Sequence, residues 1–376
     1  MKKKLKILFM DVEIPYLLKD SNFPIGGACA RIHAFSKGLT ELGNRVGILT
    51  WKGANAYVGL TSNFELVETY SLDSGIRKLR WFYMRIPKLL LKTKKFHPDV
   101  VVWKSPGDTL FLMAVICLLL KIRLVFMVTN DVIADDRIIN KIGRRSQLLH
   151  RLGIALSHAI FCQNQYQYNL FFKKFPKKIL FKITNPYYNV GVDKKYPTER
   201  KREYVAWVGI FQYQKNLPAL LRVVRRNPRL YFYIAGRESG NPDKDTKNAV
   251  KILSKCKNVK FVGYLKRYEI LEFLSKAHVL LNTSRYEGFS NTFLEAFAVG
   301  TPVICLKVNP DEILTRHKLG YIAVEKDVGK IIETIINEGE NNQLHRRLVE
   351  YLNRHHDYKS LSRELSYRLL DVVQSR

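Results

Sequence analysis

Short apolar runs alternate along the chain with longer segments in which apolar residues recur every three or four positions. An unbroken apolar run of four to six residues is typical of a strand buried on both faces, and the three-to-four spacing is typical of a helix that covers a sheet. In the first half of the chain, the runs that predict strands are 5–10, 46–49, 99–103, 124–128 and 158–162. The segments that predict helices include 32–42, 107–120, 144–156 and 165–174. This alternation predicts the α/β class, with helices packed on parallel sheets.

A second series of the same kind begins near residue 204. Its predicted strands are 205–208, 230–235, 259–262, 279–281 and 303–304, and its predicted helices include 217–224, 268–275, 327–337, 343–352 and 359–373. The polar, charged segment before it contains Pro197, which is typical of a linker. We therefore expect two Rossmann-like domains facing a cleft, one over residues 1–190 and one over 204–356, joined by a linker at 191–203.

The stretch 285–304, RYEGFSNTFLEAFAVGTPVI, contains the strongest candidate for a site. It predicts a polar loop, a helix and a strand, with Ser290, Asn291 and Thr292 suited to the start of the helix. The first turn of a helix presents unpaired N–H groups and the positive end of a dipole, so it binds phosphate or pyrophosphate. Gly288 lets a ligand approach the backbone of this loop closely, because glycine has no Cβ atom.

Two glutamates flank that helix start, Glu287 in the loop and Glu295 about one turn into the helix. A carboxylate accepts two hydroxyl hydrogen bonds, so each glutamate can bind a vicinal diol. A pyrophosphate between two diol-binding carboxylates fits a nucleotide-sugar, with ribose on one side and a hexose on the other. The alternative is a solvated surface pair, which is what two glutamates eight residues apart are in most chains.

The segment 287–304, EGFSNTFLEAFAVGTPVI, resembles the E-x7-E signature of the family-four retaining glycosyltransferases, including its Gly-Thr-Pro-Val tail. The resemblance implies the GT-B fold, with the last helix (357–376) returning to the first domain. It implies that Glu295 binds the ribose, and that Glu287 and the backbone around Phe289 bind the sugar. It also implies that no metal or other cofactor is needed. Asp243-Lys244-Asp245 resembles a metal-binding D-x-D, but it lies in a lysine-rich stretch with no strand before it and is therefore interpreted as solvent-facing.

The same resemblance extends to the loop after the strand 205–208. In the family pattern a lysine six residues after the strand-end glycine binds the donor pyrophosphate, and Gly209 and Lys215 have that spacing. An arginine that commonly follows the glycine is replaced here by Ile210. Family members bind the nucleotide base with backbone groups in a loop that corresponds to Tyr264.

On the first domain, the adjacent Gly26 and Gly27 precede a predicted helix, either as a simple turn or as a loop whose N–H groups face a ligand. The resemblance favours a loop against the donor phosphate and the acceptor. Many family members have a histidine near the end of the strand 124–128, where this chain has Asn130. Asp131 beside it is a candidate base on the acceptor side, or alternatively a helix cap. The implied mechanism is front-face transfer, in which the leaving phosphate assists deprotonation of the acceptor.

The net charge is +30, from 63 Lys and Arg against 33 Asp and Glu. Such an excess favours nucleic acid, an anionic membrane surface or an acidic substrate as partner, or reflects composition alone. No nucleic-acid-reading motif is visible, so nucleic acid ranks last. The basic segment 77–95 contains Trp81, Phe82 and Tyr83, and it predicts either a membrane-surface patch or a solvated basic face. The five cysteines are scattered without metal spacing, as expected for reduced thiols in the cytoplasm.

We therefore predict a cytoplasmic glycosyltransferase, peripheral on the inner membrane face, that transfers a hexose or N-acetylhexosamine from a UDP- or GDP-sugar. The expected acceptor is a glycan or a lipid-linked glycan in cell-surface polysaccharide biosynthesis. Two alternatives remain from the sequence: a sugar-nucleotide epimerase of the same fold, and a non-catalytic basic binding module.

Overall fold

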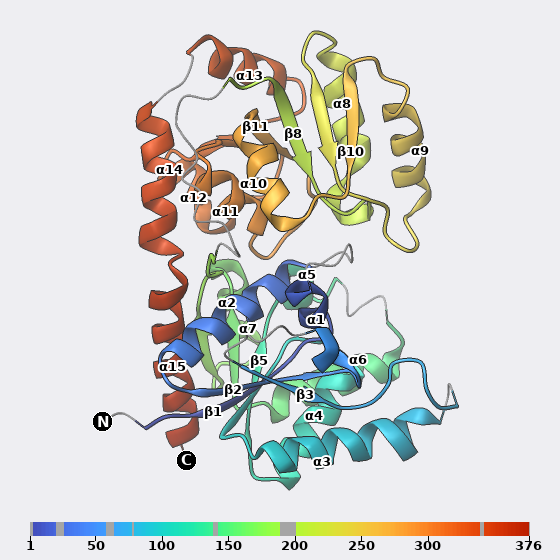
Figure 1. The fold of residues 1–376 in the computed structure, drawn as a ribbon, viewed down its shortest axis with the longest axis vertical. Helices are drawn as coiled ribbons and strands as arrows, with labels where there is room; N and C mark the ends of the chain where they lie inside the picture. The colour runs from blue at the N-terminus through green and yellow to red at the C-terminus, as the bar shows by residue number, and fades with distance from the viewer. Residues whose placement is uncertain are drawn as a thin grey trace. The chain divides into compact units, whose positions relative to one another are not determined.

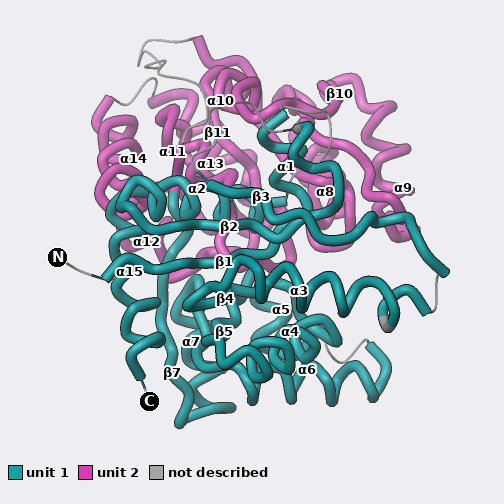
Figure 2. Tube along the Cα trace, turned by 60° about the horizontal axis from the view of Figure 1, so that its bottom comes forward, with its two compact units in different colours: residues 1–186, 358–376 teal, residues 187–357 magenta. Residues whose placement is uncertain are grey.

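The computed structural model describes residues 3–19, 26–57, 64–76, 79–137, 142–188, 201–338 and 342–375. The chain forms two compact units, which Figure 2 colours separately. Unit 1 comprises Met1–Pro186 together with Tyr358–Arg376, and unit 2 comprises Tyr187–Asp357. We expected a linker at 191–203, and residues 191–200 of it lie outside the described residues.

Unit 1 contains a seven-stranded parallel sheet in the order β3-β2-β1-β4-β5-β6-β7 (Figure 1). Residues 7–9 of β1 pair with both β2 and β4, so β1 lies between them in the middle of the sheet. The strands are β1 (Lys6–Met10), β2 (Arg45–Thr50), β3 (Glu65–Glu68), β4 (Val100–Trp103), β5 (Arg123–Met127), β6 (Ala159–Cys162) and β7 (Ile179–Lys182).

Helices cover both faces of this sheet, because its strands are apolar on both sides. One core joins the sheet to α1 (Ile14–Leu18), α2 (Gly27–Glu41) and α15 (Tyr358–Gln374), and α2 and α15 pack side by side. The opposite core joins it to α3 (Ile86–Phe96), α4 (Asp108–Leu119), α5 (Asp131–Ala134), α6 (Arg144–Leu156) and α7 (Gln165–Lys174). A π-helical turn, Trp81–Arg85, leads into α3.

Unit 2 repeats the plan with a six-stranded parallel sheet, in the order β10-β9-β8-β11-β12-β13. The strands are β8 (Tyr204–Val208), β9 (Phe232–Ala235), β10 (Val259–Gly263), β11 (Ala277–Asn282), β12 (Val303–Cys305) and β13 (Gly320–Ile322). One face packs against α8 (Leu217–Arg226), α9 (Lys244–Leu253) and α13 (Val328–Asn337). The other packs against α10 (Arg267–Ser275), α11 (Asn291–Ala298), α12 (Ile313–Arg316) and α14 (Asn342–His355).

Each sheet has one topological switch point, where successive strands stop being added on one side of the first strand and are added on the other. In unit 1 the strand order switches between β1 and β4, and in unit 2 it switches between β8 and β11. Open α/β sheets bind ligands outside the carboxyl ends of their strands at such switch points. In unit 2 the loops that leave these ends are 209–216 and 283–290, which contain Lys215 and Glu287.

The α/β class with two parallel, Rossmann-like sheets is confirmed. The predicted helices 144–156 and 165–174 coincide with α6 and α7. The last strand of the unit 1 sheet, β7, was not among the strands predicted from the sequence, and it ends at Lys182. The segment around Asp243 faces solvent as expected, since Lys244 and Asp245 are exposed. Asp243 also caps α9 by accepting a hydrogen bond from the Thr246 amide. Among the helices that the structure describes, none is both long and apolar enough to cross a bilayer.

Candidate active site

Two loops of unit 2 are held together at the switch point between β8 and β11. The Thr283 hydroxyl accepts a hydrogen bond from Trp207 Nε1 at 3.0 Å and donates to the Lys215 carbonyl at 2.7 Å. The Arg285 amide donates to the Gln214 carbonyl at 2.8 Å. These bonds fix the loop that carries Lys215 against the loop that carries Glu287.

A glycine makes the approach of the neighbouring loops possible. Gly236, directly after β9, has a φ of +146°, and a Cβ atom placed there would lie 1.9 Å from the Gly209 carbonyl oxygen. No side chain fits at that distance, so only glycine permits the loops after β8 and β9 to touch. Gly209 thus lies at the strand end, as the sequence predicted, and the 3₁₀ turn Tyr213–Lys215 follows it.

Glu287 is 8% exposed and is held by three donors. Lys215 Nζ lies 2.5 Å from Oε1 and the Ser284 hydroxyl donates to the same oxygen at 2.8 Å. Gln214 Nε2 donates to Oε2 at 2.9 Å. Both carboxylate oxygens are therefore fixed in direction, and the sequence-predicted pair of Glu287 and Lys215 is in direct contact.

Glu295 is 7% exposed and lies on the buried side of α11. Burial raises its pKa from 4.5 to about 7, while the nearby charges of Arg267 and Lys215 oppose that rise. Arg267 Nε lies 3.9 Å from Glu295 Oε1. The carboxylates of Glu287 and Glu295 therefore both face the charge of Lys215, and Arg267 adds a second cation beside Glu295.

Arg267 is a residue that the sequence analysis missed. It is the first residue of α10, and its Nη1 atom is buried without a hydrogen-bond partner. The available signal was the Lys266-Arg267 pair at the start of a predicted helix. That signal is weak, because cations at helix ends are usually solvated.

The start of α11 differs from the capping that we expected. Ser290 occupies the N-cap position, but its side chain makes no capping hydrogen bond, and its hydroxyl pairs with the Thr292 hydroxyl at 2.8 Å. The first turn contains no acidic residue. An anion at this helix start would therefore meet the positive end of the dipole without repulsion from a carboxylate of that turn.

The remaining donor-side candidates lie on the same carboxyl edge of the sheet. Gly288 and Phe289 belong to the loop between β11 and α11, and Asn291 is the first residue of α11. The Phe289 ring lies 5.0 Å from the His356 ring. Tyr264 directly follows β10, and the Arg237 guanidinium lies 5.4 Å from the centre of its ring.

In unit 1, Gly27 is the first residue of α2 and Gly26 is its N-cap. The Gly26 amide donates to Glu13 Oε2 at 2.9 Å, which fixes this glycine loop to the end of β1. Arg31, one turn into α2, is buried and donates to the carbonyls of Val128 and Ile183. Its guanidinium therefore has a structural role.

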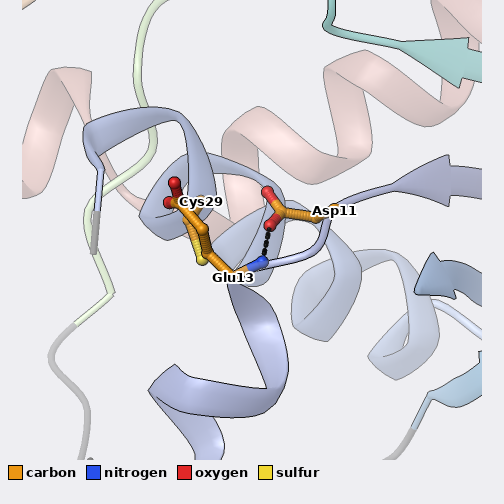
Figure 3. A group of neighbouring side chains, drawn as sticks. All are labelled: Asp11, Glu13 and Cys29. Carbon is orange, nitrogen blue, oxygen red and sulfur yellow. Dashed lines mark hydrogen bonds between the residues drawn. The ribbon is translucent and has the colours of Figure 1, made fainter. Parts of the chain in front are cut away.

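Asp11, Glu13 and Cys29 form a group whose ligand atoms all lie within 4.8 Å of one another (Figure 3). The Asp11 carboxylate accepts a hydrogen bond from the Glu13 amide, and Lys104 Nζ lies 2.5 Å from Asp11 Oδ2. The Lys104 ammonium group already neutralises Asp11, so the cluster needs no metal ion to balance that charge. Its role is structural, because Glu13 accepts the hydrogen bond that holds the glycine loop.

Asp131 lies in the first turn of α5, and Asn130 is the N-cap that accepts from the Val132 amide. The helix-cap interpretation of Asp131 was therefore wrong, because the adjacent Asn130 fills that role. Asp131 Oδ1 accepts hydrogen bonds from Asn164 Nδ2 and Gln167 Nε2, both at 2.9 Å. Burial raises the pKa of Asp131 to about 6 despite these bonds.

Both the sequence and the architecture of this chain are similar to those of known proteins. Residues 192–355 match the family model described as Glycosyl transferases group 1. A glycogen synthase of Mycobacterium tuberculosis is 28% identical over 137 residues, which are 34% of this chain and 32% of that protein. The matched segment thus spans about a third of the curated relative.

Solved structures resemble the whole chain. Sucrose-phosphate synthase from Thermosynechococcus elongatus has a TM-score of 0.73 at 14% identity, covering 99% of this chain and 100% of that one. S. aureus TarM has 0.71 at 12%, covering 99% and 100%. WaaG, a glycosyltransferase involved in lipopolysaccharide biosynthesis, has 0.66 at 16%, covering 98% and 100%. Residues 192–355 are therefore similar to a glycosyl transferases group 1 domain, and the chain as a whole has the GT-B fold.

Proposed function

We propose that this chain is a retaining glycosyltransferase that moves a sugar from a nucleoside-diphosphate sugar to a glycan or a lipid-linked glycan. The observation that carries the proposal is the row of alternating charges at the switch point of unit 2. Glu287 contacts Lys215 at 2.5 Å, Lys215 faces Glu295, and Glu295 lies 3.9 Å from Arg267. Such a row offers carboxylates for two diols and cations for a diphosphate.

Each group has a separate role in the proposal. Glu295 binds the ribose hydroxyls, and Glu287 with the backbone around Phe289 binds the hydroxyls of the transferred sugar. Lys215 and the N-terminal turn of α11, at Ser290, Asn291 and Thr292, face the diphosphate. Gly288 and Gly209 allow close backbone approach, and backbone groups around Tyr264 bind the base. The diphosphate competes with Glu287 for Lys215, which releases carboxylate lone pairs to the sugar.

The chemistry that we propose breaks the bond between the anomeric carbon and the β-phosphate oxygen. Negative charge builds on that phosphate, so stabilising it with Lys215 and the helix start lowers the barrier. In the front-face mechanism the leaving phosphate takes the proton from the acceptor hydroxyl, and the new bond forms on the same face. Gly27 and Asp131 of unit 1 are proposed for the acceptor side. The pKa of Asp131 is about 6, so near neutral pH its ionised carboxylate accepts a hydrogen bond from the acceptor hydroxyl and assists the transfer of that proton to the leaving phosphate.

The ligands bound in related structures favour particular substrates. S. aureus TarM was crystallised with UDP and α-GlcNAc-glycerol, and a pneumococcal O-GlcNAc transferase with UDP and GlcNAc. We therefore propose a UDP-sugar as the first donor to test and a GDP-sugar as the second, with a hexose or an N-acetylhexosamine as the transferred group. Because WaaG acts in lipopolysaccharide biosynthesis, cell-surface polysaccharide assembly is the proposed context.

We further propose a cytoplasmic protein that binds the inner membrane face through unit 1. The helix α3 carries exposed cations, including Lys94 and Lys95, beside Leu91, which is also exposed. Anionic lipids attract such cations, and exposed leucines add apolar contact. Co-sedimentation with phosphatidylglycerol vesicles at low salt is the measurement, and absence of binding there contradicts this part of the proposal.

A donor screen tests the function directly. A bound nucleotide-sugar stabilises the native state by about 2.7 kcal/mol at a hundred times its dissociation constant, so thermal shift detects it. Release of nucleoside diphosphate is then measured with and without an acceptor lipid extract. We expect release to require the acceptor, and Glu287→Gln to reduce the rate at least tenfold. Release without any acceptor favours the epimerase, and the absence of binding to every nucleotide-sugar in the panel contradicts an enzyme of either kind.

A further inference from the structure

Two adjoining cavities lie at the edge of the unit 1 sheet where the strands begin. They have volumes of about 650 and 540 Å³ and share two lining residues, Arg123 and His158. Arg123 is the first residue of β5 and His158 directly precedes β6. Gly27 and Asp131 follow β1 and β5 at the carboxyl ends of the strands, so the cavities lie at the opposite edge of this sheet.

The walls of both cavities carry mostly positive charge. The lining cations, besides the two histidines His97 and His158, are Lys94, Lys121, Arg123, Lys177 and Lys178. The lining contains one acid, Asp99, and its carboxylate accepts a hydrogen bond from the Lys6 amide. Among the residues that the structure describes, no ion pair joins any of these five cations to a carboxylate.

Main-chain carbonyls hold two of these cations in place. Lys178 Nζ donates to the carbonyls of Ala155 at 2.6 Å and Ser157 at 2.5 Å, and Arg123 Nη2 donates to the Ser375 carbonyl. A carbonyl fixes the direction of a cation but carries no formal charge. The positive charge of Lys178 and Arg123 is therefore positioned in the cavities, and no carboxylate of the described residues forms an ion pair with either cation.

His158 is oriented as a donor. Its Nδ1 accepts a hydrogen bond from the Leu124 amide at 3.1 Å, so the neutral ring carries its proton on Nε2. Burial lowers the pKa of His158, and the charges of Arg123 and Lys178 lower it further. Burial also lowers the pKa of Lys178. An anion bound beside these groups would act in the opposite direction on both pKa values.

We propose that these cavities bind a phosphate group, supplied either by a free phosphate compound or by the headgroup of an acidic phospholipid. Arginine and lysine donors fixed in a concave site are the usual partners of phosphate, and the arginine fork matches its oxygen geometry. The lipid source has support of its own, because Leu118 in the lining is 63% exposed and Leu119 beside it is 68% exposed. This site is independent of the donor site in unit 2.

The test uses the full chain and inorganic pyrophosphate at low salt, with the ring signals of isotope-labelled histidines as a local readout. We expect the pKa of His158 to rise on addition of pyrophosphate, and the affinity reported by this signal to fall at least tenfold in the double variant Arg123→Gln, Lys178→Gln. The matched control replaces two exposed cations of α8, Arg225→Gln and Arg226→Gln, and should leave the His158 titration unchanged. Because the histidine signal is local, pyrophosphate at the donor site does not confuse the result.

A second variant tests the proposal independently if the first variant does not fold. Lys121→Gln with Lys177→Gln removes two exposed lining cations outside α3 and should weaken pyrophosphate binding several-fold without loss of secondary structure. Vesicles separate the two sources of phosphate. If this variant loses binding to phosphatidylglycerol vesicles and pyrophosphate displaces the wild type from them, the ligand is a headgroup; if vesicle binding is unchanged, it is a free phosphate compound. A His158 signal that does not respond to either probe overturns the proposal.

Discussion

Two glutamates eight positions apart are placed in different electrostatic environments by the same short segment. Glu287 accepts hydrogen bonds from Lys215, Ser284 and Gln214, which leave little freedom to its carboxylate. Glu295 lies on the helix that follows, where burial dominates and Arg267 approaches only to 3.9 Å. A ligand hydroxyl must therefore displace existing bonds at Glu287, whereas at Glu295 it restores solvation to a buried carboxylate.

The first prediction concerns the pH dependence of donor binding. The pKa of Glu295 is about 7 in the folded chain against 4.5 ordinarily, so between these values the native state holds a proton that the unfolded state has lost. If Glu295 binds the ribose as proposed, its ionised form accepts the two hydroxyls, so affinity for UDP should rise as the pH increases through about 7. Calorimetry in buffers of different ionisation enthalpy should show proton release on binding. The control, Glu295→Gln, should bind weakly with little pH dependence; equal proton release in that variant contradicts the assignment.

A second prediction tests the effect of the Arg267 charge on the pKa of Glu295. Removing its charge leaves Glu295 with Lys215 as the other cation that lowers its pKa, so that pKa should increase. Arg267→Gln should therefore shift the pH dependence of UDP binding to higher pH and weaken affinity at pH 7 by roughly tenfold, as expected for a lost charged contact of about 1.4 kcal/mol. Arg267→Lys should retain most of the pH profile. The control is Arg316→Gln, which breaks the exposed pair with Glu312 and should change neither quantity. An unshifted profile in Arg267→Gln shows that Arg267 does not act on Glu295.

At the scale of elements, the sequence predicts long periodic helices well and short elements poorly. The segments 144–156 and 165–174 repeat their apolar positions over several turns, and both helices begin and end as predicted. The short α5 and the three-residue β13 carry too few positions for a period to show, and their existence depends on packing against neighbours. The same holds for the candidate site. The residues of the loop between β11 and α11 are close together in the sequence, so the sequence predicts them. Arg267 and Glu295 are 28 residues apart in the sequence, so the periodicity of apolar residues does not predict that they lie close together.

The end of α11 gives a prediction at this scale. Gly300 has a φ of +68°, and a Cβ atom there would lie 1.8 Å from the His345 ring of α14. Gly300→Ala should lower the free energy of unfolding by about 1–2 kcal/mol from backbone strain alone, and by more if the ring cannot move. Gly240→Ala is the control, because nothing lies within 4 Å of its Cβ position. Chemical denaturation measures both, and adding His345→Ala to Gly300→Ala should recover the steric part only. A neutral Gly300→Ala would contradict the left-handed conformation of this turn.

At the scale of the whole molecule, two successive helices near the end of the chain belong to different units. The helix α14 contributes Leu348, Tyr351 and Leu352 to one core of unit 2. After the turn at residues 356–357, α15 contributes Leu365, Leu369 and Val372 to the core of unit 1, beside Phe35 and Leu39 of α2. The stability of unit 1 therefore depends on residues that lie more than 170 positions beyond its other segment. The sixteen residues between Leu352 and Leu369 span the change from one unit to the other.

That arrangement predicts opposite effects of two chemically identical substitutions. Leu369 is fully buried in unit 1 and Leu352 is 3% exposed in unit 2, so Leu→Ala at either position removes the same atoms from a packed core. Each should cost about 2–5 kcal/mol, because the cavity left behind is only partly filled by relaxation. Hydrogen exchange locates the loss. Leu369→Ala should accelerate exchange in β1 and α2 while β8 and α11 keep their protection, and Leu352→Ala should do the reverse. If both variants lower protection equally in both sheets, the two units unfold as one cooperative body, and α15 would then report on the whole chain instead of on unit 1.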